Sequence, residues 1–106
     1  DSIVNGATAR VTDAVARRLP PLHSHFFYGA SAIHQRHLVT WYLFATDAEW
    51  ETARQNGLTS DIDKLTRKEL LAGGYPPEAV ERIFVSFVSD EEVSRKAGAN
   101  RWAYFK

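Results

Sequence analysis

The chain has 106 residues and no cysteine, and its 13 basic side chains balance its 13 acidic ones. One domain of this length (residues 1–106) buries an ordinary core unaided, and no apolar run approaches the roughly 18 residues of a membrane span. The balanced charge argues against nucleic-acid binding, and the absence of cysteine excludes thiol chemistry and favours a reducing compartment. We therefore expect a soluble, single-domain, cytoplasmic protein with no membrane or nucleic-acid partner and no cofactor.

The first third of the chain predicts one helix and two strands. Small and branched apolar residues recur at helical spacing from Ile3 to Leu19, and Pro20-Pro21 prevents the helix from continuing. Aromatic and β-branched residues then dominate two runs, Phe26 to Ile33 and Leu38 to Ala45, which are typical of strands.

The rest of the chain is divided by capping and breaking residues. Thr46 is a capping residue for a helix that ends near Gln55, and Asn56-Gly57 supplies a left-handed stop. Four further elements follow from the same reasoning: a helix from Thr59 to Ala72 closed by Gly73-Gly74, a strand from Ile83 to Val88, a helix from Ser89 to Gly98 and a strand from Arg101 to Lys106; residues 77–80 form a single turn. The order α-β-β-α-α-β-α-β predicts an α+β fold with a small antiparallel sheet of about four strands.

The spacing of the histidines raises the question of a metal or catalytic site. A four-residue loop from His34 to His37 would pair Ala30 with Trp41, which sets a small residue against a large ring. It would also place His25 beside Thr46, about 30 Å from the loop at about 3.3 Å per residue. We therefore expect no single metal site, because two imidazoles fall short of the usual ligand number.

Both faces of the predicted hairpin are apolar. We expect the core face to be the one that carries Phe26, Tyr28, Ala30, Ala32, Val39, Trp41, Leu43 and Ala45. The other face includes Tyr42 and Phe44. Either the N-terminal helix covers one face and the middle helices the other, or part of the second face is left for a partner.

The preferred interpretation is a non-catalytic protein-binding domain, whose partner is another protein or a second copy of the chain. Between Phe44 and Glu92 there are 11 acidic and 5 basic residues, which favours an acidic helical face unless basic residues from the ends fold back onto it. The candidate binding residues are Trp50 as an aromatic anchor, Glu49, Glu51, Asp61 and Asp63 on the helices, and Tyr42 and Phe44 on the spare sheet face.

The alternative is a small histidine-dependent enzyme, hydrolase-like or metal-binding, with its site near His23 and His25. In that case His25 is the general base, and Asp47, just beyond its expected cross-strand neighbour Thr46, orients it. A concave pocket lined by His25 and a carboxylate would favour this alternative over the binding module.

Overall fold

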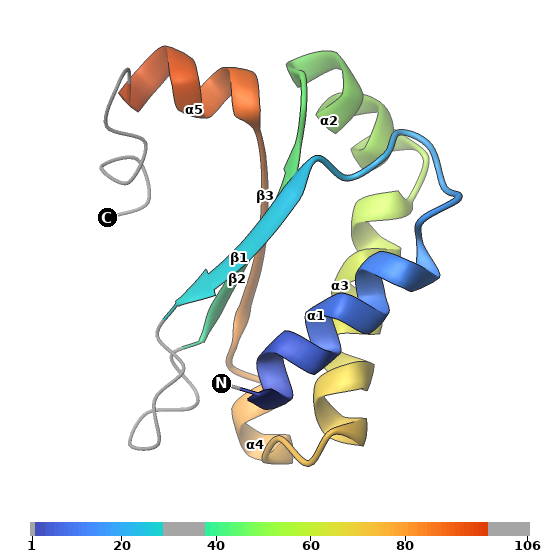
Figure 1. The fold of residues 1–106 in the computed structure, drawn as a ribbon, viewed down its shortest axis with the longest axis vertical. Helices are drawn as coiled ribbons and strands as arrows, with labels where there is room; N and C mark the ends of the chain where they lie inside the picture. The colour runs from blue at the N-terminus through green and yellow to red at the C-terminus, as the bar shows by residue number, and fades with distance from the viewer. Residues whose placement is uncertain (1, 29–37, 98–106) are drawn as a thin grey trace.

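The computed structural model describes residues 2–28 and 38–97, and these form an α+β fold (Figure 1). Its elements are α1 (Ser2–Ala14), β1 (Ser24–Tyr28), β2 (Val39–Phe44), α2 (Asp47–Gln55), α3 (Leu58–Ala72), α4 (Pro77–Val80), β3 (Phe84–Ser89) and α5 (Asp90–Ala97). The predicted fold class is confirmed, whereas the predicted strand at 101–106 and the loop at 34–37 lie outside the described residues.

The sheet is mixed rather than antiparallel, which corrects the prediction. Among the described residues its strand order is β1-β2-β3, with β1 antiparallel and β3 parallel to β2. A parallel pair needs a crossover of a dozen or more residues, usually helical. The segment from Ala45 to Ile83, which contains α2, α3 and α4, forms that crossover.

The register between β1 and β2 also differs from the prediction. Trp41 pairs with Phe26 and Tyr42 with His25, so each β2 residue pairs four residues earlier along β1 than expected. The predicted pairing rested on a short loop, and a longer connection allows the observed one. Because the shift is an even number of residues, the division of the side chains between the two faces is unchanged.

The core lies on the face of the sheet opposite to the one predicted. Helices α1, α2 and α3 lie on one side of the sheet and α5 on the other (Figure 1). The first side carries Thr40, Tyr42 and Phe44, which are at most 1% exposed. This face is buried because the crossover helices start where β2 ends and fold back over it. On the other face, Val93 of α5 packs against Leu43 at one end, while Phe84 is 65% exposed.

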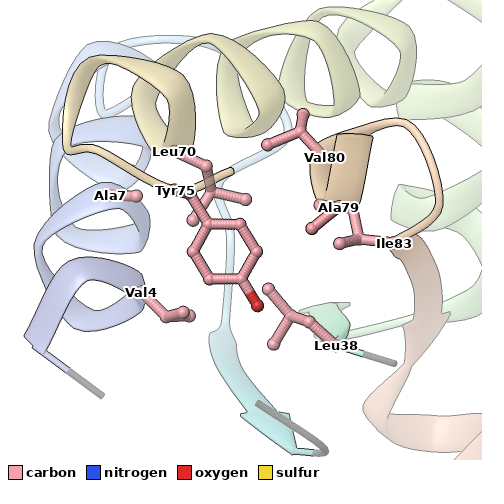
Figure 2. Packing of buried hydrophobic residues seen from close by; sticks show 8 residues of the cluster. All are labelled: Val4, Ala7, Leu38, Leu70, Tyr75, Ala79, Val80 and Ile83. Atoms are coloured by element: carbon pink, nitrogen blue, oxygen red, sulfur yellow. The ribbon is translucent and has the colours of Figure 1, made fainter. Parts of the chain in front are cut away.

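Helix α1 packs against α3 and not on a face of its own. Its Val4 and Ala7 join Leu70 of α3 in a buried cluster, and Figure 2 shows the ring of Tyr75 in its centre. The remaining members of this cluster are Leu38, Ala79, Val80 and Ile83. The cluster packs the residues just before β3 against the helices α1 and α3.

Local signals at the helix ends are confirmed. The Thr46 hydroxyl accepts from the Glu49 N–H at 3.1 Å and begins α2, and the Ser89 hydroxyl accepts from the Glu92 N–H at 3.0 Å and begins α5. Gly57 has φ +87° between α2 and α3, a conformation that glycine adopts without strain. The first helix is shorter than predicted, since regular helix ends at Ala14.

No helix in the described part of the chain combines the length and the apolarity needed to cross a bilayer.

Candidate functional site

A groove runs between β3 and the helices α2 and α5. It consists of two adjoining hollows of about 390 Å³ and about 340 Å³. Both hollows are lined by Trp50 of α2 and Phe87 of β3. The remaining lining residues are Asp47, Glu51, Val88, Ser89, Glu92 and Arg95 in the first hollow and Trp41, Arg54, Thr59, Val85 and Ser86 in the second.

Trp50 is placed in this groove by the helix that carries it. The Thr46 cap starts α2 directly after β2, and α2 packs against β3, the strand that neighbours β2. Trp50 also contacts the buried cluster around Tyr42 and Phe44, and it is only partly buried. It therefore fixes α2 to the sheet and at the same time presents part of its indole to the groove.

The strand that borders the groove has one edge without a neighbouring strand within residues 2–28 and 38–97. The N–H of Phe84 donates to the carbonyl oxygen of Leu38 on the β2 side at 3.0 Å. In a parallel ladder the residues of one strand point their N–H and C=O groups alternately to its two sides. The N–H and C=O groups of Val85 and Phe87 are therefore directed away from β2, toward the open edge.

One end of the groove is closed by a hydrogen-bonded junction between α2 and α5. The Ser89 hydroxyl donates to a carboxylate oxygen of Asp47, and Arg95 donates to the other oxygen of Asp47 at 3.0 Å. The backbone N–H of Asp47 in turn donates to Glu91 at 2.8 Å. Because the two helices hold each other reciprocally, this end of the groove is preformed.

The charged groups of the groove form ion pairs that shift their pKa values. The hydrogen bonds from Ser89 and then Arg95 lower the pKa of Asp47, and the hydrogen bond from Arg54 lowers the pKa of Glu51. Hydrogen bonds to Glu92 and Asp47 raise the pKa of Arg95. These carboxylates are therefore ionised acceptors near neutral pH rather than proton donors.

The predicted catalytic pair is not brought together. His25 lies on β1, where its ring stands 6.1 Å from the ring of Tyr42 between centroids. The carboxylate of Asp47 instead binds Ser89, the last residue of β3, and Arg95 of α5, and β2 separates β3 from β1. The register explains the separation, because His25 pairs with Tyr42 and not with Thr46.

The other histidines do not add a site to the described structure. His23 is exposed, and its backbone N–H donates to the carbonyl oxygen of Leu43 at 2.8 Å. His34 and His37 lie outside the described residues. No group of three or more histidine, aspartate or glutamate side chains within residues 2–28 and 38–97 is arranged to hold a metal ion.

The predicted acidic face is divided between two helices, and most of it is neutralised. On α3, Asp61 pairs with Arg18 at 2.8 Å and Asp63 with Arg67 at 2.7 Å. Arg18 comes from the basic N-terminal part of the chain, as expected if basic ends fold back. On α2, Glu51 pairs with Arg54 and lines the groove. The Glu49 carboxylate accepts from the Thr46 hydroxyl at 3.2 Å.

The two sheet residues proposed for binding lie in the core. Tyr42 and Phe44 are fully buried beneath the helices, so they are not on an open face of this structure. The groove residues of β3 and α5 were not predicted as site residues, above all Phe87, Ser89 and Arg95. Only the capping pattern at Ser89 marked any of them, and it indicated a helix start rather than a site.

No protein-family model, curated protein or solved structure matches this chain, so the groove is interpreted from its own geometry.

Proposed function

We propose that this chain is a non-catalytic protein-binding domain, and that the groove between β3, α2 and α5 is its binding surface. The observation that carries the proposal is the position of two adjoining hollows, both lined by Trp50, beside an edge of β3 that has no neighbouring strand in the described part of the chain. Partly buried tryptophans are frequent anchors of interface energy, and an uncovered strand edge is a template for pairing with another chain.

The electrostatics of the groove support binding over acid–base catalysis. A general acid or base works best with a pKa near the operating pH. The pKa of Asp47 is instead lowered by the hydrogen bonds from Ser89 and then Arg95, and that of Glu51 by the hydrogen bond from Arg54, from their already acidic ordinary values. Such carboxylates are suited to accept hydrogen bonds from a partner.

Site-specific photo-crosslinking in a lysate of the encoding organism tests the proposal. A photoreactive amino acid replaces Arg54, which lines the second hollow, and in a matched chain it replaces Lys68, which lies on α3 outside the groove. We expect a protein that crosslinks from position 54 and not from position 68. Equal crosslinking from both positions would contradict the proposal.

Binding of the purified crosslinked protein provides the quantitative test. Trp50→Ala should weaken its affinity more than about tenfold, because truncation of a central aromatic anchor removes about 2 kcal/mol or more. Thr59→Arg, which introduces bulk into the second hollow, tests the same surface without removing a core contact. The proposal is overturned if calorimetry shows unchanged affinity for folded forms of both variants.

A further inference from the structure

Resting on the groove proposed above as a protein-binding surface, we propose that the partner supplies an extended basic segment that adds as a strand to β3, along the edge that no other strand within residues 2–28 and 38–97 covers. The occupant is thus a peptide segment of another protein, recognised through its backbone and its positive charge. Three features of the groove lead to this assignment: the direction of the backbone groups of β3, the position of the hollows and the balance of charge.

The backbone of β3 supplies the first feature. Val85 and Phe87 direct their N–H and C=O groups away from β2, as required for an incoming strand. The six residues of β3 span about 20 Å at about 3.3 Å per residue. An added strand of about six residues would therefore pair along the whole of β3.

The two hollows supply the second feature. Successive side chains of an added strand point to opposite faces, so every second side chain points to the helix side of β3. Phe87 lies on that side and lines both hollows together with Trp50; the first hollow extends toward α5 and the second toward Arg54 and Thr59. On the opposite side the incoming strand lies next to Phe84, which is 65% exposed. The backbone therefore gives affinity, and the hollows select alternate side chains.

The charge of the groove supplies the third feature. The first hollow is lined by three carboxylates, and all three are ion-paired: Asp47 and Glu92 with Arg95, and Glu51 with Arg54. The first turns of the two helices add Glu49, Asp90 and Glu91, so that α2 and α5 together carry six carboxylates against three cations, those of Arg54, Arg95 and Lys96. A lysine or arginine of the partner is favoured at this end, whereas an acidic residue is repelled.

The test uses two seven-residue peptides with blocked ends, one alternating lysine with valine and one alternating glutamate with valine. Each is titrated into the ¹⁵N-labelled chain at low salt. We expect the lysine peptide to bind at least about tenfold more tightly, because like charges at such an end disfavour the glutamate peptide. We also expect slower amide hydrogen exchange at Val85 and Phe87. Equal affinities would overturn the assignment of a basic partner.

Backbone methylation of the lysine peptide separates strand addition from other modes of binding. Two isomers carry N-methyl groups on the odd or on the even residues. Only one set of amides faces β3 in a given register, so one isomer should lose binding and the other should retain it. If both isomers bind as the unmodified peptide does, strand addition is wrong.

Charge variants of the protein complete the test. The double variant Glu51→Gln, Glu92→Gln removes two groove carboxylates and should weaken the lysine peptide several-fold. The matched control is Asp61→Asn, Asp63→Asn, which removes two ion-paired carboxylates of α3 outside the groove and should leave the affinity unchanged. Equal effects of the two double variants would overturn the charge argument.

Failure of this inference is distinguishable from failure of the proposed function. If binding of the crosslinked partner depends on Trp50 but leaves amide hydrogen exchange at Val85 and Phe87 unchanged, the groove binds protein and strand addition is overturned. If sedimentation shows a dimer of the chain that protects the same two amides, the occupant is a second copy and the basic partner is overturned.

Discussion

Replacement of Tyr42 by phenylalanine tests the central packing of the sheet against the helices. The side chain is fully buried, and its hydroxyl lies 2.7 Å from the hydroxyl oxygen of Thr66. Thr66 uses its own proton to donate to the carbonyl oxygen of Ile62 at 2.7 Å, so Tyr42 is the donor in the pair. Burial raises the pKa of Tyr42 from 10.0 to about 12, against an opposing contribution from the bond to Thr66.

The magnitude of the effect depends on pH. Loss of one hydrogen bond lowers the free energy of unfolding by about 1 kcal/mol at neutral pH. Because the pKa of Tyr42 is higher in the folded chain than in the unfolded one, its stabilisation is complete below pH 10 and is lost as the pH rises toward 12. At pH 11 this loss amounts to about 1.4 kcal/mol in the wild type, and the phenylalanine variant does not have it.

Urea unfolding monitored by far-ultraviolet circular dichroism measures the difference, since tyrosinate formation perturbs fluorescence. We expect Tyr42→Phe to be less stable at pH 8 and about equal to the wild type near pH 11. Thr66→Val is the companion variant, and it should be more destabilising than Tyr42→Phe because it leaves a buried hydroxyl without its acceptor. A stability difference between wild type and Tyr42→Phe that is constant from pH 8 to 11 would refute the reasoning.

Three further predictions concern the core, a turn and the groove. Leu70→Ala should lower the free energy of unfolding by about 2–5 kcal/mol, whereas Leu71→Ala next to it, 46% exposed, should change it by no more than about 0.5 kcal/mol; equal losses in urea unfolding would contradict the packing of α3. Gly57→Ala should destabilise by about 1–2 kcal/mol because of its positive φ, and Gly57→Asn by less, as measured by thermal unfolding. The bond from Ser89 lowers the pKa of Asp47, so its stabilisation is present above pH 3.8 and is lost as the pH falls through the lower, folded-state value. Asp47→Asn should therefore lose less stability between pH 6 and 3 than the wild type does, and equal loss would count against the junction.

The helix boundaries were predictable because the interactions that set them are local. The hydroxyls of Thr46 and Ser89 each accept a hydrogen bond from the backbone N–H three residues later, and Gly57 adopts the left-handed conformation that the turn between α2 and α3 requires. Capping and the left-handed turn depend on residues within one helical turn of each other, so they can be recognised in the sequence.

It was also predictable which side chains of the hairpin share a face, but not which of the two faces the helices cover. Strand alternation puts His25 and Tyr42 on one side and Phe26 and Trp41 on the other in either register. Both sides are apolar, so hydrophobicity does not distinguish them. The parallel crossover made the choice, because its helices α2 and α3 cover the side of Tyr42.

The candidate site shows the same division. Trp50 and its neighbouring carboxylates were identified from residue type, but their partners in the groove, Phe87 and Arg95, are some 40 residues away along the chain. Residue order determined the elements, their caps and the amphipathic alternation of the strands, because these depend on neighbours within a few positions. The groove itself came from the parallel docking of β3 beside β2, since only that long-range pairing places β3 next to α2 and α5.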